Sequence, residues 1–452
     1  MGIMILVAVL NIAAWNSRGF SDWYIAHIFP VWVNVYGRIT GLLPFSAGEW
    51  MLGAGIVLAV LAGLLGVLWT VVGVQAGVRR IYCCARRHVR GIPEAVYAGR
   101  LAGKALGEPA DTGEGVGLSG KAVRESSDAG EGVGLGSSSA LQTGRTSCRA
   151  FGSFRRFSRS FGCFFAWTIL FVSLIMTLNC FILYHASTFS EHYFGEDTGE
   201  YTLVELIEVY NMVAGQCNSL AGEIERGEDG MAKYSGSVGK DGTPLDMEDK
   251  ARELMRQLGE TYPQLDGYYP RPKAMFFSDF MCQQYMQGYY FPFSMEANYN
   301  DVMHILNFPA TMCHELAHLR GYIYEDEANF IGYLACVESE DDFFRYAGYL
   351  SVLVYLNNDL YKAWKEERAA YEEAAAVVQP VAVDAQVWED NIFVTAEEWE
   401  RINGKALINT EIVNKAADAF IDANLKVNGI ADGKISYSRV VRLLLQYYRR
   451  KR

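Results

Sequence analysis

The stretch "WMLGAGIVLAVLAGLLGVLWTVVGVQAGV", Trp50–Val78, contains no Asp, Glu, Lys or Arg. A second run without such charges covers Ser160–Ser190. Both exceed the roughly 20 apolar residues that a helix needs to cross a bilayer core. Met1–Ser17 is shorter, and it lacks the basic start and the cleavage site of a signal peptide. The sequence therefore predicts an integral membrane protein with three transmembrane helices, the first of them uncleaved.

The charge of the connecting segments predicts the orientation of the spans. Residues 79–159 carry 14 Lys/Arg against 7 Asp/Glu, although the net charge of the whole chain is −12. Basic residues beside a span stay in the cytoplasm, so this segment is predicted inside and residues 191–452 outside. We expect a multi-pass protein of the cell membrane with the C-terminal domain extracytoplasmic. Its partners would include the lipid bilayer and no nucleic acid.

Four parts follow from this reading. Residues 1–78 would form two transmembrane helices with an outer loop, and residues 160–190 the third span. Residues 79–159 would form a basic cytoplasmic loop with a Gly-rich near-repeat, "DTGEGVGLSG" and "DAGEGVGLGS". Gly- and Ser-rich sequence without aromatic residues buries too little surface to order itself, so we expect a flexible loop. Residues 191–452 would form the extracytoplasmic domain.

The outer domain is predicted to be mainly α-helical. Thr202 with Glu205 three positions later makes a capping-box pattern before a run of apolar residues at helical spacing. "MEDKARELMRQLGETYP", Met247–Pro263, is a second amphipathic helix. The block Tyr268–Asn300 is rich in aromatic residues, Pro and Gly, and it predicts a small sheet or irregular segment. Within it, "SMEANYN", Ser294–Asn300, is a candidate edge strand to pair with a peptide substrate.

The candidate chemistry lies in "FPATMCHELAHLRGYIYEDEANFIGYLAC", Phe308–Cys336. A proline favours a helix start just after Phe308, and Gly321 is placed to end that helix. His314 and His318 then lie one turn apart on one face, as two ligands of a single zinc ion must. Glu315 is rotated by about 100°, which places it beside a metal-bound water as a general base.

The third ligand is predicted to come from the helix that starts in "EDEANF". A short connection brings the first residues of this helix back across the preceding one, where Glu327 is the natural third ligand. Glu338 is a rival at a wider His-to-Glu spacing, and Glu325 is another. Two histidines and one carboxylate would leave a fourth position open for water, which is the catalytic arrangement.

These residues resemble the gluzincin metallopeptidases, in which the zinc glutamate opens a helix shortly after the histidines, and this resemblance favours Glu327. More broadly, the chain resembles an uncharacterised bacterial family of three-span membrane proteins, known as a domain of unknown function and assigned as zinc peptidases by motif. The likeness covers nearly all of the chain except the Gly-rich loop. It implies a zincin-like outer domain without indicating a substrate. It rests on the site and on "LPFSAGEW", "RPK", "YYFPFSMEANYN", "RYAGYLSVLVY" and "GKISYSRVVRLLL".

Other polar residues are candidates for supporting roles. An oxyanion formed during hydrolysis needs a donor besides the metal, and His304, Tyr346 and Tyr349 are available, although a lone histidine and aromatic residues at helical spacing are more often structural. Asp326 and Asn329 are placed to orient the ligating imidazoles.

The sequence thus predicts a membrane-anchored zinc metallopeptidase that cuts a peptide bond with Glu315 as general base. Its substrate would be a peptide or protein associated with the membrane or the cell wall. The alternative is a non-catalytic membrane receptor or scaffold with a structural or vestigial zinc site. Structural zinc sites, however, usually close with four protein ligands and prefer cysteine. A third reading, hydrolysis of a non-peptide bond such as a cell-wall amide, stays open.

Overall fold

The computed structural model describes residues 2–90, 137–195, 201–239, 242–427 and 437–452. The described chain is mostly helical, as predicted, with five short strands. It divides into two units: one combines Met1–Ala54 with Ile169–Arg452, and the other is Gly55–Thr168. The Gly-rich near-repeat of the predicted cytoplasmic loop lies outside the described residues.

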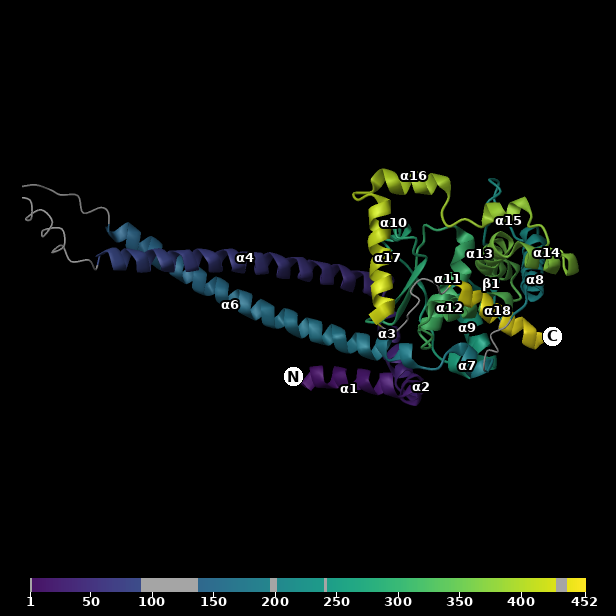
Figure 1. Cartoon of the computed structure of the whole chain (residues 1–452), viewed down its shortest axis with the longest axis horizontal. Helices are drawn as coiled ribbons and strands as arrows, with labels where there is room; N and C mark the ends of the chain where they lie inside the picture. Colours follow the sequence, from purple (N-terminus) through teal and green to yellow (C-terminus); the bar gives the residue numbers. More distant parts are fainter. Residues whose placement is uncertain (1, 91–136, 196–200, 240–241, 428–436) are drawn as a thin grey trace, which may run out of the picture. The chain divides into compact units, whose positions relative to one another are not determined.

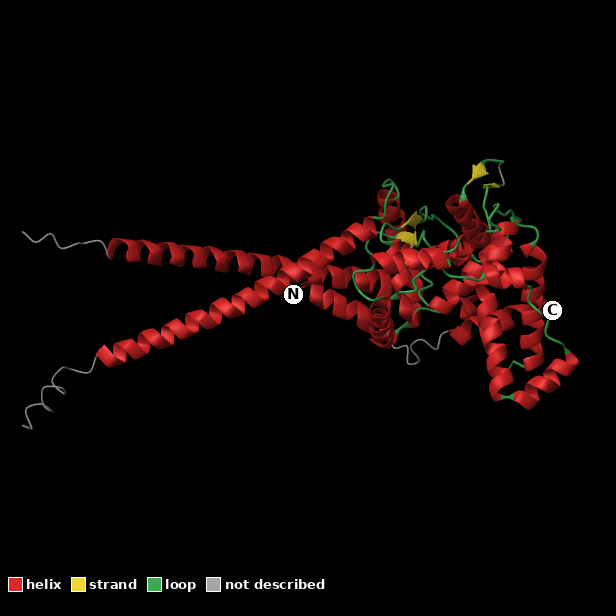
Figure 2. Ribbon diagram, turned by 90° about the horizontal axis from the view of Figure 1, so that it is seen from above, coloured by secondary structure: helices red, strands yellow, loops and turns green. Residues whose placement is uncertain are grey.

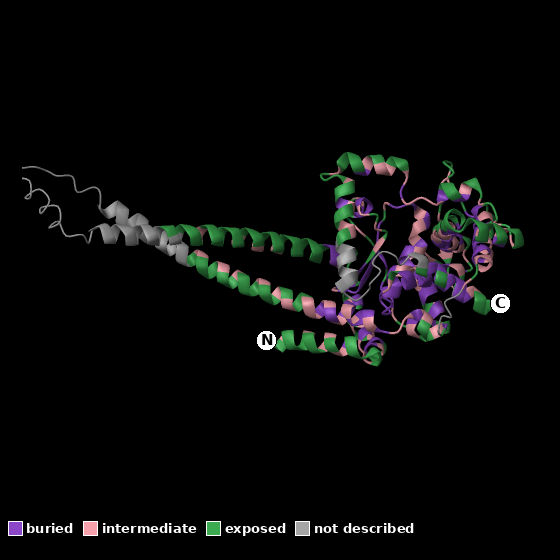
Figure 3. Cartoon of the chain, in the orientation of Figure 1, coloured by how far each residue is buried: buried purple, intermediate pink, exposed green. Residues whose placement is uncertain are grey.

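Two helices are long and apolar enough to cross a membrane. The candidate spans are Ala47–Gln75 in α4 (Ala47–Arg90) and Ser153–His185, which begins in α6 (Ser137–Met176). Most of their described side chains are exposed, as the green colour of Figure 3 shows. Both helices continue into residues 79–90 and 137–159, for which the sequence predicts a flexible loop.

The N-terminal segment is a bent pair rather than a straight helix followed by a loop. Helix α1 (Gly2–Asn16) turns by 114° into the segment Arg18–Thr40, which contains α2 (Arg18–His27) and α3 (Phe29–Thr40). Ser17 caps α2, because its hydroxyl accepts a hydrogen bond from a backbone N–H of the first turn. If the pair counts as one span, the described residues hold three candidate spans; otherwise they hold two.

The helices of residues 201–452 gather around α11 (Phe308–His318) and α12 (Glu325–Val337) (Figure 1). Buried aromatic rings such as Phe330, Tyr333 and Phe344 fill the space between them, because each helix turns one apolar face inward. Helix α8 begins with the predicted capping box. Helices α9 (Met247–Thr261), α13 (Asp342–Glu366) and α18 (Tyr437–Lys451) pack against these two helices, and α8 (Leu203–Ala221) packs on α13.

Shorter elements complete this unit. They are η1 (Thr177–Phe181), η2 (Leu183–His185), α7 (Phe189–Tyr193), η3 (Pro263–Leu265), α10 (Ser278–Gln283), η4 (Ile305–Asn307), α14 (Arg368–Val377), α15 (Ala385–Asp390), α16 (Ala396–Lys405) and α17 (Thr410–Val427).

Two small sheets appear in yellow in Figure 2. One is the antiparallel pair β1 (Ser237–Val238) and β2 (Pro244–Leu245). The other has the order β3-β5-β4 and consists of β3 (Lys273–Ala274), β4 (Gly288–Phe291) and β5 (Glu296–Tyr299). The prediction that "SMEANYN" forms an edge strand is therefore wrong: β3 pairs in parallel with β5 and covers that edge. Within the described residues, β3 and β4 are the two edge strands of this sheet, and β4 is the longer one.

A buried ion pair fixes the start of α4 on this sheet. Lys273 Nζ lies 2.6 Å from Glu296 Oε1, and the same ammonium donates to the carbonyl of Thr40 at 2.7 Å. The Glu296 carboxylate also accepts the backbone N–H groups of Ala47 and Gly48, the first residues of α4, at 3.1 and 2.8 Å. A carboxylate at a helix N-terminus satisfies orphan N–H groups and is favoured by the helix dipole.

We predict that Lys273→Ala destabilises this unit by about 3–5 kcal/mol, because it leaves the buried Glu296 charge without its partner. The free energy of unfolding, measured by urea titration of the full chain in detergent micelles, checks this. Arg368→Ala is the matched control, since its pair with Glu372 is exposed and is worth at most about 0.5 kcal/mol. An equal, small effect of both substitutions would contradict the prediction.

Candidate metal centre

Helices α11 and α12 lie antiparallel in close contact because the sequence between them ends the first helix sharply. Gly321 has φ +90° and donates its N–H to the carbonyl of His318 at 3.0 Å, which is a C-terminal arrangement that favours glycine. Farther along α12, a Cβ on Gly332 would lie 2.7 Å from the carbonyl oxygen of Ala310. The missing side chain of Gly332 is thus what lets the two helix backbones approach.

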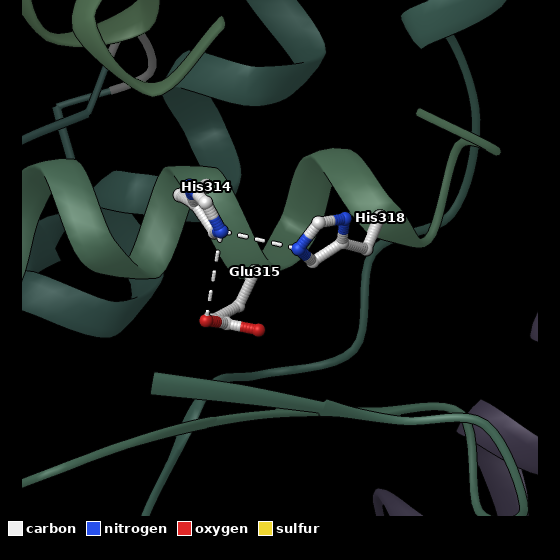
Figure 4. A group of neighbouring side chains, drawn as sticks. All are labelled: His314, Glu315 and His318. Atoms are coloured by element: carbon white, nitrogen blue, oxygen red, sulfur yellow. Dashed lines mark hydrogen bonds and ion pairs between the residues drawn. The ribbon is translucent and has the colours of Figure 1, made fainter. Parts of the chain in front are cut away.

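The two histidines of α11 point their Nε2 atoms at one another. These nitrogens are 3.1 Å apart (Figure 4). Two zinc–nitrogen bonds of roughly 2.0–2.1 Å at a tetrahedral angle would separate the nitrogens by about 3.3 Å. The observed separation of His314 and His318 is therefore close to that of two ligands of one ion.

Both imidazoles are held through their other nitrogen. His314 Nδ1 lies 2.9 Å from Asn329 Oδ1, and His318 Nδ1 lies 2.7 Å from the carbonyl oxygen of Tyr322. Oxygen acceptors at these positions require Nδ1–H donors, which leaves the Nε2 lone pairs available for a metal. Asn329 has the orienting position that the sequence suggests for it, whereas the Tyr322 carbonyl has no side-chain signal in the sequence.

The carboxylate nearest the two imidazoles belongs to Glu325, the first residue of α12. Its Oε2 lies 3.1 Å from His314 Nε2, and its Oε1 lies 3.9 Å from His318 Nε2. The Glu325 side chain is 58% exposed, while the His318 side chain is 5% exposed. The structure therefore offers Glu325 as the third donor, on the side of the site that is open to solvent.

Glu327, the third ligand favoured by the resemblance, lies elsewhere. Its Oε1 accepts the backbone N–H of Phe189 at 2.6 Å and that of Ser190 at 3.4 Å, the first residues of α7. Two positions along a helix rotate a side chain by about 200°, so Glu325 and Glu327 cannot both face α11. Burial raises the pKa of Glu327 to about 8, with a further rise from Asp326, and the two N–H groups only partly offset it.

Two more predicted carboxylates also lie apart from the imidazoles. Glu338 follows the last turn of α12, about 20 Å from Glu325 at roughly 1.5 Å per residue, and it accepts the hydroxyl of Tyr447 at 3.2 Å. Asp326 is buried in the field of Arg439. It does not hold the imidazoles, because Asn329 and a carbonyl occupy both Nδ1 atoms.

Glu315 lies beside the histidines, as its place in the helix predicts. Its Oε1 is 3.9 Å from His314 Nε2 (Figure 4), and its residue is 4% exposed. The other oxygen, Oε2, is buried without a hydrogen-bond partner among the described residues. Burial raises the pKa of Glu315 to about 8, although His314 opposes this rise. A carboxyl group that titrates near neutral pH suits a general base.

His314 and Glu325 shift one another's pKa values in opposite directions. Burial lowers the pKa of His314, but the hydrogen bond and charge of Glu325 outweigh burial and raise it to about 9. Partial shielding from solvent raises the pKa of the half-exposed Glu325 carboxyl, but the hydrogen bond and charges of the two histidines outweigh it and lower that pKa to about 2. Burial and His314 together lower the pKa of His318 to about 4. A cation that binds here must displace the His314 proton, so its affinity should rise with pH.

These donors fit a divalent metal ion. Two imidazole nitrogens and one carboxylate oxygen form a donor set typical of catalytic zinc. The two imidazole nitrogens lie 3.1 Å apart, Glu325 Oε2 lies 3.1 Å from His314 Nε2, and Glu325 Oε1 lies 3.9 Å from His318 Nε2. The Glu315 carboxylate lies next to them. Among the described residues, one ligand atom from each of His314, Glu315 and His318 lies within 4.8 Å of the other two.

A strand passes directly over Glu315. A Cβ on Gly288, the first residue of β4, would overlap Glu315 Oε1 and would lie 2.8 Å from Thr311 Cγ2. Only glycine allows this approach of a backbone to the site. In the sequence, this close approach of a strand is indicated by the single glycine before the aromatic run "YYF" in the predicted sheet segment.

The candidate oxyanion donors have other surroundings. The hydroxyl of Tyr346 donates to Asp390 Oδ2 at 2.6 Å, and the Arg226 guanidinium binds the same carboxylate. Tyr349 packs its ring on Tyr333 at 6.0 Å. Neither ring nitrogen of the buried His304 has a hydrogen-bond partner among the described residues, and burial lowers its pKa. The structure brings none of the three into a contact with the imidazoles.

We predict that Tyr346→Phe destabilises the domain by about 1.5–3 kcal/mol at pH 7, because a buried charged acceptor loses its donor. Burial raises the pKa of Asp390, but Arg226 and Tyr346 outweigh burial and lower it below its usual value. The stabilisation is therefore present above the unfolded pKa of about 3.9 and is lost as pH falls through the folded value. The difference in the free energy of unfolding between Tyr346→Phe and the wild type should become smaller below about pH 4.

Thermal unfolding of the full chain between pH 3 and 7 measures this difference. Tyr349→Phe serves as the control and should change stability little at any pH. A pH-independent loss in Tyr346→Phe would contradict the role assigned to Asp390.

Comparison with known proteins places the chain in a family. The model of a family described as "Protein of unknown function (DUF3810)" matches residues 141–445, about two thirds of the chain. The match begins within α6 and ends within α18, so it includes α11 and α12. No curated protein and no solved structure matches the chain.

Proposed function

This chain belongs to the DUF3810 family, whose function is unknown, and we propose that it is a membrane-anchored zinc metallopeptidase with a zincin-like outer domain. The observation that carries the proposal is the group of donors from α11 and from the first residue of α12. The imidazoles of His314 and His318 and the carboxylate of Glu325 converge, and Glu315 stands beside them with one oxygen unpartnered.

The chain's own residues supply the acid–base chemistry. When bound, zinc supplies a Lewis acid that polarises a carbonyl and acidifies water. Glu315 takes the proton of the attacking water on its unpartnered oxygen and delivers it to the leaving amine. Asn329 and the Tyr322 carbonyl keep the two imidazoles in the ligating tautomer.

The free edge of β4 supports a peptide as the substrate. Asn300 donates its N–H to the carbonyl of Gln287 at 2.8 Å, which makes these two residues a hydrogen-bonded antiparallel pair. Such pairs alternate along the ladder, so the backbone groups of Gly288 and Tyr290 point away from β5. The Tyr290 N–H is directed at the Glu315 carboxylate, so an extended peptide would pair with the remaining groups as an added strand. Because Gly288 overlies Glu315, the peptide would pass the general base.

A catalytic site is favoured over a structural one by the composition of this cluster. A structural zinc site usually closes with four protein ligands, often cysteines. Cys313, the neighbour of His314 in the sequence, points its sulfur to the Ala251 carbonyl at 4.0 Å. The half-exposed Glu325 gives the centre a solvent side, as a site that exchanges substrates needs.

The basic segment 79–159 supports an outer location of the site, as the positive-inside rule requires.

We predict that Glu315→Gln keeps zinc and lowers peptide hydrolysis by about 10²–10⁴-fold, the usual contribution of a general base. Zinc content by mass spectrometry and cleavage of a randomised peptide library by the purified full chain measure the two properties. If the variant retains full activity, Glu315 is not the base. If it loses the metal instead, Glu315 is a fourth ligand and the site is a closed structural one.

We predict that Glu325→Ala weakens zinc binding by at least about 100-fold, because loss of a ligand should exceed the 10–100-fold cost of losing a residue that supports one. Glu327→Gln should leave the affinity nearly unchanged, because an amide oxygen can still accept the two N–H groups of α7. Calorimetric titration of the metal-free chain with zinc measures both. If Glu327→Gln weakens zinc binding and Glu325→Ala does not, Glu327 is the third ligand.

A further inference from the structure

The strand over the site connects Glu315 with the first turn of a candidate membrane span. Gly288 begins β4 above Glu315, and Phe291 ends β4 against α4, where a Cβ on Gly48 would lie 2.7 Å from the Phe291 ring. Three steps along a strand of about 3.3 Å each cover only about 10 Å. The general base is therefore about 10 Å from the start of the span.

The bilayer surface is marked on α4 by an abrupt change in burial. The Glu49 carboxylate is buried and accepts the backbone N–H groups of Phe276 and Phe277, both at 2.9 Å. The next residue, Trp50, is 72% exposed, and none of the described side chains from Trp50 to Gln75 is buried (Figure 3). Exposed apolar side chains on an uncharged helix belong in lipid, so the lipid begins near Trp50.

The second candidate span reaches the same end of β4. None of its described side chains is buried from residue 153 to 174, and burial begins at Ile175. A few residues later, Asn179 donates its side-chain amide to the carbonyl of Pro292 at 2.7 Å, and its own carbonyl accepts the hydroxyl of Tyr290 at 3.1 Å. Both spans are thus fastened to residues 290–292.

Exposed aromatic side chains surround this junction. Phe276, Phe277 and Phe280 are 86%, 56% and 50% exposed, and the rings of Phe276 and Phe277 lie 5.2 Å apart. Phe45 packs edge-on against Trp50 with ring centroids 6.3 Å apart. Aromatic residues gather at the level of the lipid headgroups, where their rings are partly buried in the interface. This aromatic group therefore rests on the bilayer surface.

On the basis of the function proposed above, we propose that the substrate is a membrane-anchored peptide or protein, cut in an extended segment just outside the bilayer. A strand paired with β4 covers the distance from the lipid to Glu315 in about three residues. The scissile bond then lies about three to six residues from the anchor. Confinement to the bilayer also raises the effective concentration of such a segment at the site.

The experiment compares one randomised peptide cassette in three presentations, with the full chain reconstituted in phosphatidylcholine–phosphatidylglycerol vesicles with zinc. The cassette is free in solution, joined to a phospholipid through four residues, or joined through 20 prolines, which hold it about 60 Å away. The two tethered forms have equal surface density. Cassette cleavage through the short tether should be at least about tenfold faster than in the other two forms, and Glu315→Gln should abolish it.

The outcomes separate this inference from the function on which it rests. Equal cleavage of all three forms overturns the membrane-anchored substrate and leaves the peptidase intact. Cleavage of no form overturns both.

A second measurement does not depend on activity. A phospholipid with a photoreactive diazirine in its headgroup should label Phe276–Phe280, identified by mass spectrometry, and not the exposed pair Tyr361 and Trp364 of α13. Labelling of α13 alone, or equal labelling of both, would overturn the inference.

Discussion

The site depends on the absence of one side chain, at the contact of α11 with α12. A Cβ on Gly332 would lie 2.7 Å from the carbonyl oxygen of Ala310 and 3.2 Å from the backbone nitrogen of His314. Any larger residue must push the helices apart. The donors of α12 would then recede from His314, because Asn329 and Glu325 reach it with bonds of only 2.9 and 3.1 Å. One close approach of two backbones therefore aligns residues from both helices.

Buried carboxylates have two different uses in this domain. Glu296 binds the N–H groups of Ala47 and Gly48, and Glu49 binds those of Phe276 and Phe277. In each case, as with Glu327 on α7, consecutive N–H groups at the start of a segment donate to the carboxylate, and the residue holds the chain in place. Glu315 differs, because one of its oxygens has no partner among the described residues. An unpaired buried oxygen costs free energy, which a site tolerates where a reaction uses that oxygen.

The sequence predicts those features that depend on a single helix or on hydropathy. The spacing of His314, Glu315 and His318 needs only the helical period, and the uncharged runs need only their length. The third donor could not be predicted in this way. Whether Glu325 or Glu327 faces α11 depends on the turn at Gly321, whose positive φ sets the phase of α12. The position of β5 likewise depends on β3, a strand of only two residues that no periodicity reveals.

The position of Glu325 has a consequence for binding. A carboxylate at the first position of a helix is stabilised by the helix dipole without a fixed hydrogen bond. Glu325 forms ion pairs with the two imidazoles, and its side chain is 58% exposed. Glu327, by contrast, is buried and fixed by two N–H groups of α7. In the proposed zinc site, the third ligand must be able to turn from a protonated histidine to the metal. Glu325 has no backbone hydrogen bond in its way among the described residues, whereas Glu327 is held by two. Glu327, which the sequence resemblance favours, thus holds α7 in place, whereas its exposed neighbour Glu325 faces the imidazoles.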